Sequence, residues 1–223
     1  MLPMNVAGGR LAGGVSAHIL RGLVGDSSFT IVSNNCWGAH IYRALGVGYA
    51  TPFVGLFITP KCYLTLLENF DLLMLTDLVF TNHSHLVSLN AWRKREDLSY
   101  SIGILGGEVE INFQHYSLEK DARAKWRRRC RRMTNNPARR FFKFDDREGA
   151  RSADIIKFGR LPLDNKVCFT ARPHESGSIL APAEAGTDHV IDGLALGEVS
   201  GHYFNALRWL STWPRWVALP SLL

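Results

Sequence analysis

Hydrophobic and polar positions alternate most regularly between Glu108 and Gln114. Val109, Ile111 and Phe113 share one side of this segment, and the residues between them are polar. A repeat of two places successive side chains on opposite faces of an extended chain. The pattern therefore predicts a β-strand that turns one face toward the core.

Other short hydrophobic runs alternate with segments of helical spacing. Residues 29–33 predict a strand, Asn34 and Asn35 a tight turn, and residues 38–45 a helix. The same order recurs farther along the chain. We expect further strands at residues 53–58, 141–144 and 167–171, and further helices at residues 61–70, 152–158 and 203–210.

Two features mark the starts of helices. Thr59 followed by Pro60 is a typical helix start, because Thr can cap free N–H groups and Pro fits the first turn. A helix is also expected after Ser117, with an apolar stripe and many arginines on its other faces. Residues 81–98 are polar and aperiodic, which predicts a loop or a poorly packed helix.

The order of these elements indicates the fold class. Strands that alternate with helices are typical of an α/β protein. We therefore expect a mainly parallel or mixed sheet covered by helices. If the domain has two lobes, their boundary is expected near residues 81–98.

Composition is compatible with one domain. The chain has 223 residues, and its 46% hydrophobic content is enough for a complete core. We expect a glycine-rich N-terminal arm at residues 1–27, weakly helical or mobile rather than packed, a single α/β domain at residues 28–211, and an apolar tail at residues 212–223. No apolar run approaches the roughly 20 residues that a membrane helix needs.

The net charge favours anionic partners. Lys and Arg number 26 against 20 Asp and Glu, which gives a net charge of +6. Nucleotide sugars, other sugar phosphates and the surface of an anionic membrane are therefore candidate partners. No nucleic-acid-binding motif accompanies the arginines, so a nucleic acid partner is not expected.

Cysteine usage indicates a reducing compartment. Cys36, Cys62, Cys130 and Cys168 are widely spaced and form no CxxC pair, so free thiols are expected rather than disulfides. No leader-like segment is apparent near the start of the chain. We expect a cytoplasmic protein that can attach peripherally to the inner membrane.

Several ordered blocks resemble one bacterial family. The run Ser33-Asn34-Asn35-Cys36-Trp37-Gly38 lies in the first of these blocks, which are residues 29–38, 51–58, 110–116, 125–129, 143–149, 165–170 and 202–204. The sequence is similar there to a family of domains of unknown function (nineteen-nineteen), whose members are named as exopolysaccharide or capsule biosynthesis proteins. The resemblance implies an α/β fold and a role in surface-polysaccharide assembly.

The turn around Cys36 is the first candidate site. Cys36 follows a predicted strand and begins a helix, where free N–H groups and the helix dipole stabilise an anion or a thiolate. This arrangement suits a nucleophilic Cys36 with His115 as general base; His115 follows the alternating strand at residues 108–114, which also carries Glu110. It also suits a phosphate held by Asn34 and Asn35. In the alternative interpretation the asparagines only close the turn and Cys36 packs as a small hydrophobe.

A second candidate site follows the predicted strand at residues 141–144. Asp145 and Asp146 are hard carboxylate ligands that suit Mg²⁺ or Mn²⁺ over a diphosphate. The alternative is a solvated turn that caps the next helix.

Basic residues near the strand margins are candidates for binding an anionic substrate. Lys143, Arg147 and Lys166 lie at these margins, and Arg128 lies on the basic helix. Most arginines of that helix are expected to be solvated.

These residues and the resemblance lead to three hypotheses. The first is a transferase of surface-polysaccharide assembly that acts on a sugar carried by a nucleotide or lipid diphosphate, with His115 as base. The second is an acyl transferase or hydrolase that uses Cys36 with His115. The third is a non-catalytic partner in glycan assembly.

Overall fold

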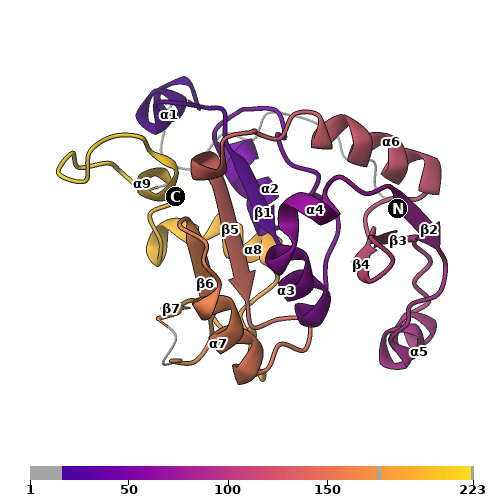
Figure 1. Ribbon diagram of the computed structural model, residues 1–223. Helices are drawn as coiled ribbons and strands as arrows, with labels where there is room; N and C mark the ends of the chain where they lie inside the picture. The colour runs from indigo at the N-terminus through magenta and orange to yellow at the C-terminus, as the bar shows by residue number, and fades with distance from the viewer. Residues whose placement is uncertain (1–16, 175–176, 222–223) are drawn as a thin grey trace.

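A computed structural model describes residues 17–174 and 177–221 of the chain. It has an α/β fold with two sheets, as expected from the sequence (Figure 1). The first sheet is parallel, with the strand order β1-β5-β6-β7, and the second is antiparallel, with the order β2-β3-β4. The strands are β1 Thr30–Ser33, β2 Leu78–Thr81, β3 Ile102–Leu105, β4 Val109–Asn112, β5 Arg140–Asp145, β6 Lys166–Thr170 and β7 Ile179–Leu180.

Helices cover both faces of the parallel sheet. The α-helices of the described residues are α1 Ala17–Val24, α2 Trp37–Ala44, α3 Pro60–Glu68, α4 Phe70–Leu73, α5 Val87–Arg95, α6 Glu119–Cys130, α7 Ser152–Arg160, α8 Gly193–Glu198 and α9 Ala206–Leu210, of which α5 and α6 lie beside the antiparallel sheet (Figure 1). No described helix is long and apolar enough to cross a membrane.

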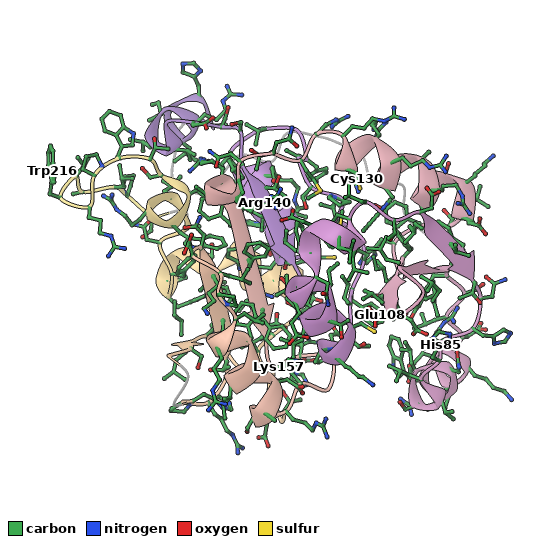
Figure 2. The ribbon with its side chains drawn as sticks, viewed as in Figure 1. His85, Glu108, Cys130, Arg140, Lys157 and Trp216 are labelled. Carbon is green, nitrogen blue, oxygen red and sulfur yellow. The ribbon has the colours of Figure 1, made fainter. Side chains whose placement is uncertain are left out.

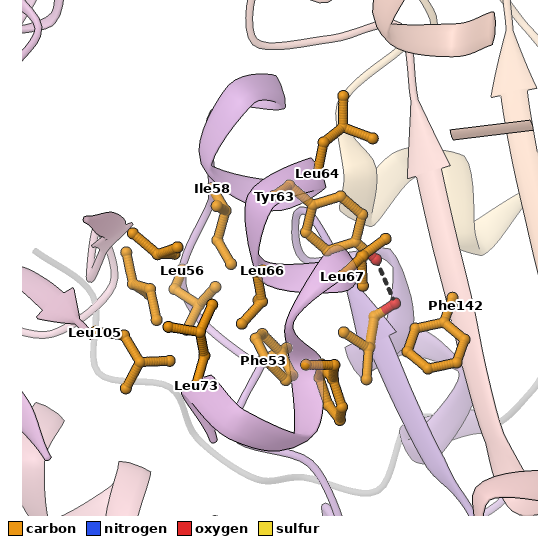
Figure 3. Packing of buried hydrophobic residues seen from close by; sticks show 14 of the residues in the cluster. Phe53, Leu56, Ile58, Tyr63, Leu64, Leu66, Leu67, Leu73, Leu105 and Phe142 are labelled. Atoms are coloured by element: carbon orange, nitrogen blue, oxygen red, sulfur yellow. Dashed lines mark hydrogen bonds between the residues drawn. The ribbon is translucent and has the colours of Figure 1, made fainter. Parts of the chain in front are cut away.

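Alternation along the strands divides the core into two layers. Ile31 and Phe141 face α1, α2, α8 and α9, whereas Val32 and Phe142 face α3, α4 and α7. Figure 3 shows part of the second layer, in which Tyr63 lies among leucines of α3 and donates a hydrogen bond of 2.8 Å to the Val32 carbonyl (dashed line). Because both faces of the parallel sheet are covered, most residues of its strands are hydrophobic on either face.

The predicted strand at residues 53–58 is wrong. This segment is irregular, with a single bridge between Phe57 and Asn112. Pro52 precedes it, and Gly55 has a φ of +76°, a conformation that interrupts an extended strand. Hydrophobic content correctly indicated that the segment is buried, but it did not indicate the backbone conformation.

The irregular segment joins the two sheets. The Phe57 N–H donates to the Asn112 carbonyl at 3.0 Å, and the next N–H, of Ile58, donates to the Asn34 carbonyl at 2.8 Å. Asn112 ends β4 and Asn34 follows β1. Consecutive backbone groups therefore hold the ends of one strand from each sheet close together.

Other expectations were met in part. The strand predicted by alternation is β4, although its polar residues Glu110 and Asn112 are buried rather than solvated. The arm expected at residues 1–27 includes a packed helix, since Leu20 and Val24 of α1 are buried against α9, while residues 1–16 lie outside the described part. The polar stretch at residues 81–98 contains the helix α5.

Candidate functional site

A buried polar cluster lies where β1 and β5 end. Lys143 and Asp145 are fully buried and form an ion pair. The Lys143 ammonium also donates to the side-chain oxygens of Asn34, at 3.2 Å, and Asn35, at 2.9 Å. An ammonium group has three donors, so all the hydrogen-bonding capacity of Lys143 is used within the cluster.

The two asparagines complete the cluster by binding Asp145. The Asn34 amide donates to one carboxylate oxygen at 2.8 Å, and the Asn35 amide donates to the other at 2.7 Å. Burial alone would raise the pKa of Asp145, but the charge of Lys143 and the two amides lower it overall. Asn34 and Asn35 therefore do more than close the turn, because they satisfy a buried charge pair.

Cys36 lies beside this cluster, just before α2. Its Sγ atom is 3.9 Å from the Leu56 carbonyl, and burial raises the pKa of the thiol. In the described part of the chain, no hydrogen bond joins Cys36 to a histidine. A buried thiol without a basic partner stays protonated at neutral pH.

Within the described residues, no hydrogen bond links Cys36 to His115 or to Glu110, the other two residues of the predicted catalytic group. His115 is exposed in a turn after β4, where its backbone N–H donates to the Gly55 carbonyl at 3.1 Å. Glu110 is buried and accepts hydrogen bonds from the Ser84 hydroxyl and the His85 backbone. Its carboxylate also lies 3.3 Å from Nδ1 of His85, which is located beside α5 (Figure 2). The histidine that Glu110 contacts is therefore His85.

The Asp145–Asp146 pair does not fit a divalent cation. Asp145 is neutralised by Lys143, and the two oxygens of Asp146 accept backbone N–H groups of Ala171, at 2.7 Å, and Val190, at 2.8 Å. Among the described residues, no group of three or more His, Cys, Asp or Glu side chains could hold a metal ion. We therefore derive no metal-dependent step from these residues.

The expected basic ligands mostly contact protein atoms. Arg147 pairs with Glu184 and donates to the Val190 carbonyl at 2.7 Å. The Lys166 ammonium donates to carbonyl groups at the end of α7. Arg128 is exposed on α6.

A pocket of about 560 Å³ opens next to the buried cluster. One wall is the start of α3, a second is α5, and a third is the turn after β5. Its lining includes Phe57, Thr59, Lys61, Trp92, Glu148 and Arg151. It lies near the carboxyl end of a parallel strand, where ligands bind in α/β proteins.

Glu148 is a titratable group of this pocket with a shifted pKa. It adopts a left-handed backbone conformation, with φ of +60°, directly after the strand and turn that carry Asp145. Partial desolvation and the negative charge of Asp145 raise the pKa of Glu148 to about 7, although the residue remains exposed to solvent. Both protonation states of Glu148 are therefore populated at neutral pH, as general acid–base catalysis requires.

The start of α3 supplies anion-binding groups to the same pocket. Thr59 is the N-cap residue and Pro60 the first helical residue, as the sequence predicted. The Thr59 hydroxyl makes no capping bond and is buried without a partner in the described part of the chain. The free N–H groups of the first turn, this hydroxyl and the ammonium of Lys61 together suit a phosphate group.

Sequence reasoning missed most of this pocket. After the strand at residues 141–144 the sequence drew attention to Asp145 and Asp146 rather than to Glu148, and Trp92 lies in the segment expected to be a loop or a poorly packed helix. The Thr59–Pro60 helix start was the available signal, since a helix N-terminus after a buried segment is a candidate anion site.

The chain is similar to proteins whose activity is not established. Residues 19–207 match the model of the family described as Domain of unknown function (DUF1919), so the chain belongs to this family. It is also 34% identical over 149 residues to a protein of Haemophilus influenzae described as "Uncharacterized protein". That match covers 67% of this chain and 65% of the relative, which is less than two thirds of the relative's length.

Proposed function

We propose that this member of the DUF1919 family is a transferase that acts on a sugar linked to a nucleotide or lipid diphosphate. The observation that carries the proposal is Glu148, a carboxyl group with a pKa of about 7 on the wall of a pocket that also presents cationic groups. The role in surface-polysaccharide assembly follows from the family resemblance of the sequence.

The pocket has groups for each part of such a substrate. Lys61, Arg151 and the start of α3 would bind the diphosphate through charge and backbone N–H groups. The rings of Phe57 and Trp92, which lie nearly perpendicular to each other, provide an apolar wall against which a sugar ring can pack.

Glu148 would move the proton in this reaction. As the acceptor hydroxyl attacks the anomeric carbon, the Glu148 carboxylate takes the hydroxyl proton and a new glycosidic bond forms. The bond between the anomeric carbon and the diphosphate breaks, and the diphosphate leaves with the bonding electrons. Lys61 and Arg151 would stabilise the charge that develops on the leaving group.

The buried cluster of Lys143, Asp145, Asn34 and Asn35 would adjust the pKa of Glu148. Asp145 raises the pKa of Glu148, whereas Lys143 lowers it. Asn34 and Asn35 hold both charges in place. These four residues would thus act as positioning residues, and Glu148 would be the catalytic residue.

Binding and turnover measurements test the proposal. The full chain is titrated by calorimetry with a panel of nucleotide sugars and soluble lipid-diphosphate sugars, and transfer to water or a sugar acceptor is followed by chromatography. Binding of at least one donor is expected, with weaker binding for the Lys61→Ala, Arg151→Ala double variant. Glu148→Gln is expected to bind the donor and to lose turnover by about 100-fold or more.

The exposed Lys157 provides a matched control, since it pairs with Glu68 outside the pocket. Lys157→Ala is expected to bind the donor as the native protein does. If no donor binds, or if the pocket variants bind as tightly as Lys157→Ala, the proposal is wrong.

A further inference from the structure

Exposed leucines lie next to arginines on one side of the molecule. Leu75 is 86% exposed and Leu72 is 68% exposed. Figure 1 shows α6 beside β2 at this side. We name this region the α4–α6 surface; it consists of Leu72, Leu75, Arg123, Arg127 and Arg131.

A shallow groove of about 310 Å³ connects the apolar and basic parts of the α4–α6 surface. Leu75 lines it from one side and the three arginines line it from the other. The arginines are spaced four residues apart along α6 and its end, so they form one stripe on the helix. Asp77 is the acidic residue of the groove lining.

Two of the arginines have no acidic partner. Arg123 donates to the Leu78 carbonyl at 3.1 Å and pairs with Glu119, which fixes the stripe against β2. Arg127 and Arg131 are exposed, and no ion pair engages them within the described ranges. Their guanidinium groups are therefore available to an external anion.

We propose that the α4–α6 surface docks on an anionic lipid bilayer. Guanidinium groups bind lipid phosphates, and exposed leucines beside them can enter the interface between headgroups and acyl chains. The net charge of +6 adds long-range attraction to such a surface. A nucleic acid would use the arginines but would gain nothing from Leu72 and Leu75, so the bilayer fits the whole surface better.

This inference does not depend on the proposed transferase activity. The α4–α6 surface and the Glu148 pocket have no lining residue in common. Membrane docking and donor binding can therefore fail separately.

Vesicle co-sedimentation of the full chain tests the inference. The probes are vesicles of phosphatidylcholine alone and vesicles with 30% phosphatidylglycerol, prepared at low and high salt. Binding is expected only to the anionic vesicles and is expected to weaken with salt. Arg127→Ala with Arg131→Ala should weaken binding about 30-fold, since each basic residue near the membrane contributes about 1 kcal/mol.

The apolar contribution is measured with a second variant. Leu75→Ser is expected to weaken binding by about tenfold, because Leu75 no longer enters the interface. Matched controls lie on α5: Val87→Ser, at a side chain 82% exposed, and the double variant Lys94→Ala, Arg95→Ala should bind as the native protein does. Circular dichroism verifies that each variant is folded.

Three outcomes would overturn the inference. The first is an absence of binding to anionic vesicles. The second is equal loss of binding in the α5 controls, which would show attraction by net charge alone. The third is binding that tolerates Leu75→Ser and is displaced by double-stranded DNA or RNA, which would identify the arginine stripe as a nucleic-acid site.

Discussion

Lys143 and Asp145 lie two residues apart on β5 and face each other in a fully buried ion pair. Side chains two apart on a strand share a face, so the strand itself sets this pairing. Asn34 and Asn35, at the end of the neighbouring strand, provide the remaining hydrogen bonds. The Ser33–Gly38 segment is thus tied to the centre of the parallel sheet.

Removing one partner of this ion pair should destabilise the protein. Lys143→Met leaves the Asp145 carboxylate buried without a counter-charge, and we expect the free energy of unfolding to fall by about 3–5 kcal/mol. Urea denaturation followed by circular dichroism measures the change. Adding Asp145→Asn to Lys143→Met should recover part of the loss. Lys157→Met, which removes an exposed ion pair, should cost less than about 1 kcal/mol, and an equal loss for the two lysine variants would contradict the prediction.

The stability of the protein should depend on the pH through Glu148. Its pKa is about 7 in the folded protein, against an ordinary value of 4.5. Between these pH values the folded state binds more protons than the unfolded state, so stability falls as the pH rises. Solvent reduces the size of this effect because Glu148 is exposed, but Glu148→Gln should still unfold at a higher temperature than the native protein at pH 8 and at a similar temperature at pH 4.

Thermal unfolding across this pH range checks the prediction for Glu148. Glu108→Gln, at an exposed position in the turn before β4, is the control and should change the pH dependence of unfolding less than Glu148→Gln does. A difference between Glu148→Gln and the native protein that does not change with pH would contradict the assigned pKa.

Cys36 should react slowly in the folded protein. Burial raises the pKa of its thiol, and alkylation requires the thiolate. With iodoacetamide at pH 8, mass spectrometry should show much slower labelling of Cys36 in the native chain than in the urea-unfolded chain. Cys36→Ala should retain donor binding. Fast native labelling together with loss of activity would instead support the thiol-dependent acyl transferase or hydrolase.

A methyl group at Gly193 should disturb the buried cluster. A Cβ atom at this position would lie 2.5 Å from Oδ1 of Asn35, the atom that accepts a hydrogen bond from Lys143. Gly193→Ala should therefore lower the free energy of unfolding by about 1–3 kcal/mol. Gly22→Ala is the control, because Gly22 lies in α1 with nothing within 4 Å of a Cβ atom. This control should be stabilising by about 0.5–1 kcal/mol, since alanine favours a helix, and equal losses in both variants would contradict the assignment.

Local patterns predicted three strands of the parallel sheet, β1, β5 and β6, and one strand of the antiparallel sheet, β4. Alternation at β4, the run of aromatic residues at β5, and the Thr59–Pro60 start of α3 each have a local physical cause. Residues 53–58 were misassigned because hydrophobicity reports burial and not backbone conformation. The left-handed Gly55 and the bonds to both sheets depend on distant parts of the chain.

The candidate site was predictable only in part. The turn at Asn34 and Asn35 was correctly placed after β1, but their binding to Asp145 requires the parallel pairing of β1 with β5, across more than 100 residues. The sequence did carry one indication of the buried cluster: Lys143 and Asp145 are two charges on one face of β5, a strand rich in phenylalanine. Glu148 could not be singled out, because its raised pKa comes from partial desolvation and the charge of Asp145, and both depend on the folded conformation of the turn after β5.

The backbone bonds of Phe57 and Ile58 also constrain movement around the Glu148 pocket. One wall of the pocket belongs to α5, which follows the edge strand of the antiparallel sheet, and the opposite wall follows β5 of the parallel sheet. Rotation of one sheet against the other would have to stretch a bond from Phe57 to Asn112 or from Ile58 to Asn34. These two bonds therefore limit movement of the pocket walls, which would lower the entropic cost of assembling the walls around a ligand.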